Sequence, residues 1–186
     1  MWIVILIIGI IAVIVYNSRA HEKDMQKINR KNGTPELTSE AKTLMNDFYK
    51  DFTKGQRYAY YNLLSSLAEC HASSSSATKR KVAFTVRQTA QCLNISEDQA
   101  DVYIHQNGVD ELCRQIASIP KGAQLDSLIS TAFGIASSAE GYMQGMKANE
   151  MALTIMMKTF EEAGISEDDV TDSLEKTALI ASKFMK

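Results

Sequence analysis

Proline and alternating hydrophobic patterns are scarce in this chain of 186 residues. Its two prolines are Pro35 and Pro120, so a single proline follows in the last 150 or so residues. Proline interrupts helices because it has no amide hydrogen and its ring clashes with the preceding turn. Hydrophobic positions recur at helical spacing nearly throughout, and no alternating apolar–polar pattern lasts more than a few residues. The body of the chain is therefore predicted to be all-α.

Cysteine is also sparse, with Cys70, Cys92 and Cys113 widely spaced and odd in number. Such a set does not suit a disulfide framework, and we expect reduced thiols buried as small hydrophobic side chains in a cytosolic domain. A zinc site that also used His71 and His105 lacks the usual C-x₂₋₄-C or H-x₃₋₅-H spacing. The sequence contains neither a glycine-rich phosphate loop nor a Gly-x-Ser-x-Gly motif, so no cofactor is expected.

Cys70-His71 places a thiol next to an imidazole, the two groups from which cysteine enzymes build a nucleophile and its base. Adjacent residues on a helix point about 100° apart, so the two side chains are not expected to face each other. We expect a buried cysteine, a partly exposed histidine and no enzymatic activity. A cysteine-dependent enzyme remains an open hypothesis, and the acidic groups near Asp98 and Asp168 are interpreted as helix caps.

The first eighteen residues contain a long apolar run, since residues 2–16 carry no charge. As a helix rising about 1.5 Å per residue, this run would extend roughly 23–27 Å, near the lower limit for a bilayer span. Only Met1 precedes it, so the basic start of a secretory signal peptide is missing, although Ser18-Arg19-Ala20 resembles a cleavage site. We predict a transmembrane anchor over residues 1–18. A secreted helical protein with a cleaved signal peptide remains the alternative.

Charge supports the anchor and gives it a direction. Five of the 20 basic residues and two of the 22 acidic ones lie in residues 19–31, so this segment is net positive by three and the remainder net negative by five. Basic residues beside a span favour the cytoplasmic side, which predicts a single-pass protein of the inner or plasma membrane with its N terminus outside. Residues 19–38 form a basic stalk whose charges suit anionic lipid headgroups. The acidic body argues against nucleic acid as a partner.

Residues 39–186 are predicted to form one helical domain. Helical spacing, capping residues and breaks at Gly55, Gly108 and Pro120 divide it into segments. Ser96-Glu-Asp-Gln99 has the form of a capping box, and Gly141 and Gly145 are taken to bracket a loop. The expected helices cover about 39–53, the stretch after Gly55 to 71, 77–93, 96–107, 109–119, 125–139, 149–163 and the residues from 166 onward.

A degenerate repeat runs through this domain. Cys92-Leu-Asn-Ile-Ser-Glu-Asp98 recurs 70 positions later as Glu162-Ala-Gly-Ile-Ser-Glu-Asp168. Each copy lies about twenty residues after a loop that follows an apolar, serine-rich helix. The same helix–loop–helix–cap unit is therefore used twice, and two units favour a closed pseudo-twofold bundle over a solenoid.

These repeats resemble those of the TerB-like family, the tellurite-resistance TerB domain and its membrane-anchored relatives. The family's loop, glutamate and cap signatures correspond to Gln144-Gly145 with Glu150 and Ile165-Ser-Glu167 in the second half, and to Ser74-Ser75-Ser76 with Ile95-Ser-Glu97 in the first. Ile119-Pro120 falls where the family has a central Leu-Pro turn. The resemblance covers roughly residues 40–180 and implies a bundle of about seven or eight helices. Some anchored relatives carry a J-domain, but this chain has no His-Pro-Asp tripeptide.

The resemblance also implies a calcium site formed by acidic residues of the two loops. Ca²⁺ takes six to eight oxygen ligands, several of them carboxylates. Gln144 and Ser74 stand where the family has aspartates, Arg80 lies near the first glutamate position, and only Glu150 is kept. We expect weak or no metal binding at Gln144 and Glu150. A calcium sensor is the alternative function.

Aromatic and methionine side chains are the remaining candidates for a binding surface. Most are expected in the core, but Tyr49 and Tyr60 fall off the apolar helix faces and would extend a partner-binding patch. The methionines would suit an adaptable groove or the core. The function favoured by the sequence is a membrane-tethered cytosolic interaction or scaffold module, in envelope or stress response as the resemblance implies, with a protein partner. The aromatic candidates are Phe48, Tyr49, Phe52, Tyr58, Tyr60 and Tyr61, and the methionine candidates include Met143, Met146, Met151, Met156 and Met157.

Overall fold

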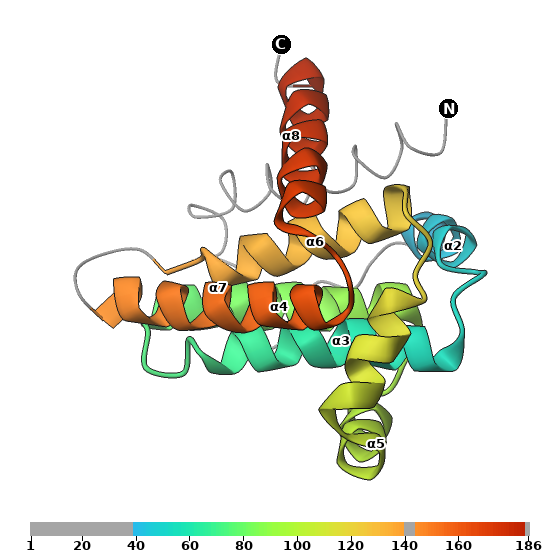
Figure 1. Cartoon of the computed structure of the whole chain (residues 1–186), viewed down its shortest axis with the longest axis horizontal. Helices are drawn as coiled ribbons and strands as arrows, with labels where there is room; N and C mark the ends of the chain where they lie inside the picture. The colour runs from blue at the N-terminus through green and yellow to red at the C-terminus, as the bar shows by residue number, and fades with distance from the viewer. Residues whose placement is uncertain (1–38, 140–143, 185–186) are drawn as a thin grey trace.

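A computed structural model describes residues 39–139 and 144–184 (Figure 1). These residues form helices and no strands, which confirms the all-α prediction. The predicted anchor (1–18) and the stalk up to residue 38 lie outside the described residues. In the part of the chain that is described, none of the helices combines the length and the apolar character needed to cross a bilayer.

The described residues form seven helices. Their bounds are α2 (Ser39–Phe48), α3 (Lys54–Glu69), α4 (Ser76–Leu93), α5 (Glu97–Ala117), α6 (Ala123–Ala136), α7 (Gln144–Glu162) and α8 (Glu167–Phe184).

Several predicted boundaries are wrong. Helix α2 ends at Phe48, five residues before its predicted end, and Gly55, predicted as a break, lies in the first turn of α3. Gly145 was expected in a loop but lies buried in the first turn of α7, where a glycine disturbs few hydrogen bonds. Helix α6 ends at Ala136, three residues early. There the hydroxyls of Ser137 and Ser138 donate to the carbonyls of Phe133 and Gly134, the local bonding by which serine weakens helices.

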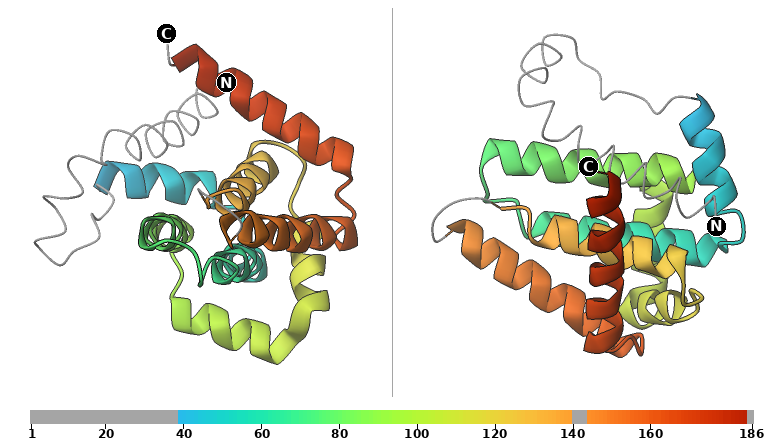
Figure 2. Two further views of the ribbon diagram at one scale, coloured as in Figure 1. Left: turned by 90° about the vertical axis from the view of Figure 1, so that its left-hand side faces the viewer. Right: turned by 90° about the horizontal axis from the view of Figure 1, so that it is seen from above.

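Helices α3 and α6 form the centre of the molecule. They contact each other, α3 also packs against α4, α5 and α7, and α6 also packs against α7 and α8. Figure 2 shows α4 and α5 on different sides of this pair, with α2 lying across the end of α4. Helix α8 crosses α6, where Ser130 and Thr177 share a hydrogen bond of 2.8 Å, and its far end projects from the body (Figure 1).

Tyr49 and Tyr60 are core residues, which overturns their prediction as part of a surface patch. They are 2% and 1% exposed, respectively. The Tyr49 hydroxyl lies 3.1 Å from that of Ser127, and the Tyr60 hydroxyl lies 3.4 Å from both Ser127 and Thr131. Helical spacing placed these rings outside the apolar faces, but hydroxyl partners on α6 allow them to be buried. Burial raises the pKa of both phenols.

The repeated sequence forms the same turn twice. Asn94 (φ 51°, ψ 53°) and Gly164 (φ 74°) follow α4 and α7 in the left-handed region. The next amides, of Ile95 and Ile165, donate to carbonyls five residues back, at 3.1 and 2.8 Å. This is the Schellman arrangement, in which asparagine and glycine are the residues that tolerate positive φ.

The two caps after these turns differ. Ser166 caps α8 as predicted, since its hydroxyl accepts the Asp169 amide and the Asp169 carboxylate accepts the Ser166 amide. Ser96 occupies the N-cap of α5 but makes no side-chain cap bond, so the predicted capping box is wrong there. Gln99, its expected partner, instead accepts a hydrogen bond from the Tyr58 hydroxyl at 2.9 Å.

Candidate functional site: a groove between α3 and α5

A bend in α5 shapes the candidate site. Gly108 has φ 77° and ψ 179°, which divides α5 into two arms as the sequence predicted. This backbone region is open essentially only to glycine, because a Cβ atom would clash with the adjacent peptide groups. The first arm, before Gly108, faces the N-terminal end of α3, and the second arm continues to Ala117 (Figure 1).

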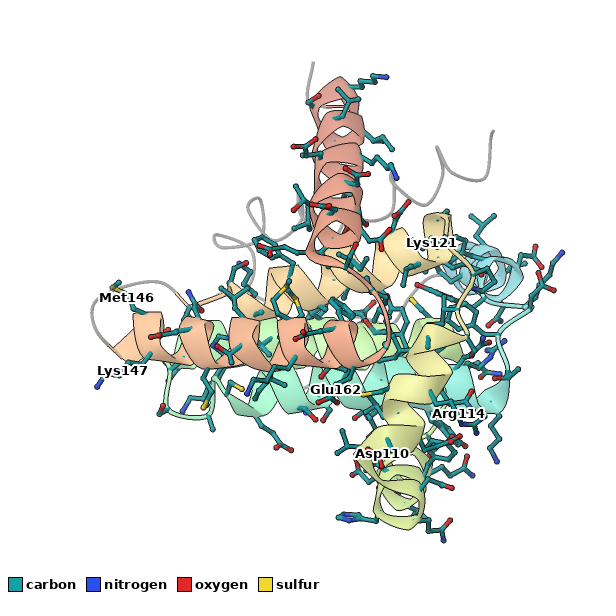
Figure 3. All side chains as sticks on the ribbon, in the orientation of Figure 1. Asp110, Arg114, Lys121, Met146, Lys147 and Glu162 are labelled. Atoms are coloured by element: carbon teal, nitrogen blue, oxygen red, sulfur yellow. The ribbon has the colours of Figure 1, made fainter. Side chains whose placement is uncertain are left out.

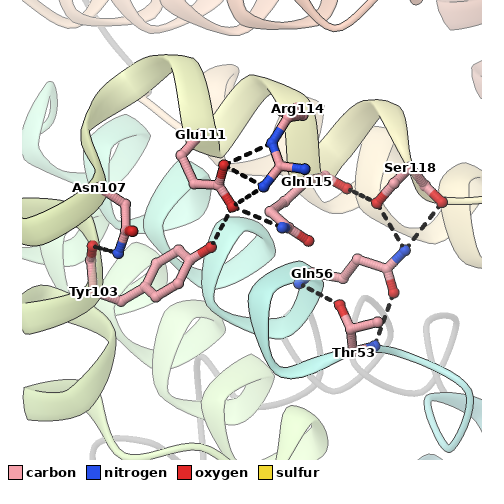
Figure 4. Close-up of polar contacts among 8 residues, drawn as sticks. All are labelled: Thr53, Gln56, Tyr103, Asn107, Glu111, Arg114, Gln115 and Ser118. Atoms are coloured by element: carbon pink, nitrogen blue, oxygen red, sulfur yellow. Dashed lines mark hydrogen bonds and ion pairs between the residues drawn. The ribbon is translucent and has the colours of Figure 1, made fainter.

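A fixed carboxylate bridges the bend (Figure 4). Glu111 on the second arm accepts hydrogen bonds from the Tyr103 hydroxyl (3.0 Å) on the first arm and from the Gln115 amide (2.7 Å). The Arg114 guanidinium contacts both carboxylate oxygens, at 2.6–2.7 Å. The Gln115 and Arg114 hydrogen bonds lower the pKa of Glu111, while burial raises the pKa of Tyr103. The angle between the arms is thus held by side chains as well as by Gly108.

The start of α3 is attached to the second arm. Thr53 and Gln56 form a reciprocal capping box, with the two backbone amides donating at 2.9 and 3.1 Å. The side-chain amide of Gln56 (Nε2) also donates to the carbonyl oxygen and to the hydroxyl oxygen of Ser118, each at 3.0 Å (Figure 4). A Cβ built on Gly55 would lie 2.6 Å from Gln115, so glycine permits this close approach.

Between the start of α3 and the first arm lies a groove of about 450 Å³. Its floor contains Tyr58 and Tyr103, whose rings are 5.2 Å apart, and Val102 is 53% exposed on its rim. The Lys54 ammonium lies 5.4 Å from the centre of the Tyr58 ring. The lining residues are Lys54, Gly55, Tyr58, Asp98, Gln99, Val102, Tyr103 and Gln106.

This arrangement suits binding of a short apolar segment. Aromatic rings and an exposed valine offer apolar contact, while glutamine and charged side chains on the rim can pair with peptide groups. Both tyrosine hydroxyls already have acceptors, Gln99 for Tyr58 and Glu111 for Tyr103. The rings are therefore held in place before a ligand arrives, which lowers the ordering cost of binding.

The Cys70-His71 pair lies elsewhere, at the end of α3. The Cys70 thiol donates to the Ser66 carbonyl at 3.5 Å, back along its own helix, and burial raises its pKa. The prediction of a partly exposed histidine is wrong, because His71 is 1% exposed. Its Nδ1 lies 3.5 Å from the Ser74 hydroxyl, and its buried Nε2 has no hydrogen-bond partner. Burial lowers the pKa of His71, although the Ile135 backbone has a smaller effect that raises it.

The other zinc candidates do not meet. Cys92 and Cys113 are buried thiols in the described structure, and burial raises the pKa of each to about 11. Cys113 donates to a Glu162 carboxylate oxygen at 3.4 Å, whereas His105 is exposed on the first arm of α5. Within the described ranges, no group of three or more histidine, cysteine, aspartate or glutamate side chains could hold a metal ion.

The two degenerate calcium positions fall on α7. Gln144 begins this helix, but its side chain lies outside the described residues, and the Glu150 side chain is exposed. Between them, Asn149 holds the preceding segment, because its amide group both accepts from and donates to the Ala139 backbone at 3.0 Å. Helix α7 contacts α6, α3 and α5.

The methionines divide between core and surface. Met156 is buried and Met157 packs against the core. Met146 and Met151 are exposed on α7, and Figure 3 places Met146 near its start beside Lys147, away from Arg114 and the α5 bend. Met143 lies outside the described residues. Among the described residues, the methionine side chains of α7 do not line the α3–α5 groove.

Comparison of the chain with protein-family models, curated proteins and solved structures gives no match.

The groove was missed by sequence analysis because its residues come from two helices about 45 positions apart. Tyr58 was assigned to the core by its spacing, and Val102 and Tyr103 were not singled out. The available signal was the Asn107-Gly108 break, which predicted a bend in the helical segment. Without tertiary structure, the bend did not indicate which helix it faces.

Proposed function

We propose that this chain is a membrane-tethered helical interaction module that binds a segment of a partner protein in the α3–α5 groove. The observation that carries the proposal is the groove itself, with two fixed tyrosine rings and an exposed Val102. The partner segment presents an apolar side chain to the rings and hydrogen-bonding groups to Gln99 and Gln106. The module acts by binding rather than by catalysis.

The tether in this proposal is the apolar run of residues 1–18, with the basic stalk of residues 19–38 on the cytoplasmic side. The TerB-like resemblance and the pseudo-twofold duplication belong to the proposal as well. They are supported by the repeated Schellman turns at Asn94 and Gly164. In both halves, a helix–loop–helix unit precedes the turn.

A photocrosslinking experiment tests the groove. The full-length protein is expressed in cells with benzoylphenylalanine in place of Val102, and adducts are identified after ultraviolet irradiation. We expect one discrete partner adduct whose yield falls several-fold when Tyr103→Ala is added, because that substitution removes one ring of the floor.

The matched control places the same crosslinker at Val109, which is 60% exposed on the second arm of α5 and does not line the groove. Absence of an adduct at Val102, or the same adduct from both positions, would contradict partner binding in the groove.

The tether is tested separately by alkaline carbonate extraction of membranes from the same cells. An integral anchor keeps the chain in the membrane pellet, because its apolar segment remains in the hydrocarbon core. Release of the full-length chain into the supernatant would exclude the tether without bearing on the groove.

A further inference from the structure

Helix α4 carries a concentration of positive charge in an otherwise acidic domain. Residues 70–96, which include all of α4, contain four lysines and arginines and no aspartate or glutamate. Over residues 39–186 as a whole, 15 basic residues face 19 acidic ones. The charge of this helix is therefore opposite to that of the domain around it.

These charges lie on the outer side of the helix. Lys79, Arg80 and Lys81 are exposed, and so is Arg87, which lies almost two full turns after Arg80. Phe84 is half-buried between the two arginines and lies on the same face. The opposite side of α4 is apolar and packs into the core through Val82, Val86 and Leu93.

Neither salt bridge recorded among the described residues involves Lys79, Arg80 or Lys81. The Arg80 side chain donates to the Ser76 carbonyl at 3.1 Å, which leaves its charge without an anionic partner there. Three adjacent cations of this kind repel one another, and an external anion relieves the repulsion.

The position of α4 indicates which anionic surface it meets. Its main contacts are with α3 and α2, so it lies along an edge of the helical body (Figure 2). Helix α2 lies across the C-terminal end of α4, where Arg57 donates to the carbonyls of Tyr49 and Leu93. Helix α2 begins at Ser39, where the chain joins the basic stalk and the apolar run. The C-terminal end of the outer face of α4, which carries Arg87, is thus close to the point from which the tether departs. Lys79, Arg80 and Lys81 lie about 20 Å from that end of the same helix.

We propose that the outer face of α4 docks on the anionic headgroups of the membrane that holds the tether. Each lysine or arginine near an anionic leaflet favours the docked state by about fivefold, and Phe84 adds apolar contact at the interface. Docking orients the domain, so that the groove between α3 and α5 is presented at a defined angle to the bilayer. This inference rests on the tether of the proposed function.

Lysine footprinting of the full chain in lipid nanodiscs tests the docking. The protein is reconstituted in phosphatidylcholine alone or in phosphatidylcholine with phosphatidylglycerol, and acetylation rates are measured by mass spectrometry. In the anionic discs we expect Lys79 and Lys81 to react about fivefold more slowly, and salt near 1 M, where the Debye length is about 3 Å, to restore their rate. Lys147 and Lys158, exposed on α7, serve as controls whose rates do not change.

A charge-reversed protein, Arg80→Glu with Lys81→Glu, provides the matched variant. Both residues are exposed, so the fold is retained, and Lys79 remains as the reporter. Its protection in anionic discs should disappear. Equal labelling of wild-type Lys79 and Lys81 in the two lipids would overturn the docking, as would protection that appears only when RNA is added to neutral discs.

Failure of the tether has a different outcome, because the chain then does not remain in the neutral discs. In that case the same protein is mixed with preformed anionic vesicles, and the labelling of Lys79 and Lys81 still reports whether α4 docks.

Discussion

At the residue scale, Arg57 connects three segments through their backbone carbonyls. Its guanidinium donates to Tyr49 and Leu93 at 2.6 Å each and to Phe52 at 3.3 Å. Tyr49 and Leu93 lie at the C-terminal ends of α2 and α4, where carbonyls lack helical partners and the helix dipole is negative. One half-buried cation therefore satisfies the ends of two helices and the turn before α3.

Substitution Arg57→Ala should lower the free energy of unfolding by about 2–3 kcal/mol, because it removes a charged donor from all three carbonyls, although that of Tyr49 keeps the Phe52 amide. Arg57→Lys should recover only part of the loss, since an ammonium cannot fork between separated acceptors. Urea unfolding followed by circular dichroism measures both changes. Lys147→Ala, at an exposed position, is the control and should stay within about 0.5 kcal/mol of wild type. A similar value for Arg57→Ala would show that the three bonds contribute little.

His71 makes stability depend on pH. Burial lowers its pKa in the folded protein, so below about pH 6.5 the unfolded chain takes up a proton that the folded chain resists. The stability that His71 contributes is present above this pH and is lost as the pH falls. Its slope is at most about 1.4 kcal/mol per pH unit.

Urea unfolding of wild type and His71→Gln between about pH 7 and pH 5 tests this, since glutamine has no proton to gain. The variant should have the flatter profile in this range. Identical slopes for the two proteins would mean that the buried imidazole does not titrate between them.

At the element scale, the two Schellman turns offer a matched comparison. Gly164 has φ 74° and Asn94 has φ 51°, although the turns are otherwise alike. Gly164→Ala and Asn94→Ala should each cost about 1 kcal/mol, because a Cβ atom disfavours the left-handed region. Gly164→Asn should cost less than Gly164→Ala, and Asn94→Gly should be close to neutral.

The four free energies of unfolding are compared by urea denaturation. A loss for Gly164→Asn as large as that for Gly164→Ala would show that packing, rather than backbone conformation, selects glycine at this turn.

At the scale of the whole molecule, the two sequence halves share one core. The hydroxyls of Tyr49 and Tyr60, in the first half, both hydrogen-bond with the hydroxyl of Ser127 in the second half, and α3 packs against α6. A fragment of residues 39–119 would expose the apolar face of α3 and leave these hydroxyls without their partners.

We therefore expect residues 39–119 alone to show no cooperative thermal transition by circular dichroism. Mixing them with residues 120–186 should restore a cooperative transition, because the shared core can then form. A cooperative transition in the first fragment alone would show that each half folds independently.

The helices and turns could be predicted from the sequence, but the groove could not. The Asn94 and Gly164 turns and the bend at Gly108 depend on local backbone preferences, so they could be predicted from a few neighbouring residues. The burial of Tyr49 and His71 could not be predicted in this way, because the residues that surround them come from α6: Ser127 beside Tyr49 and the Ile135 backbone beside His71. Periodicity describes one helix face at a time and does not indicate which other helix covers it.

The amino-acid sequence by itself determined the all-α class, the points where the chain turns and the charge contrast between α4 and the rest of the domain. These follow from local propensity and composition. Only the tertiary structure decided that α3 meets the bent α5 to form a groove, and that the basic face of α4 lies outward while its apolar face packs into the core. Both depend on contacts between helices distant in sequence, which are selected by the packing of the whole core.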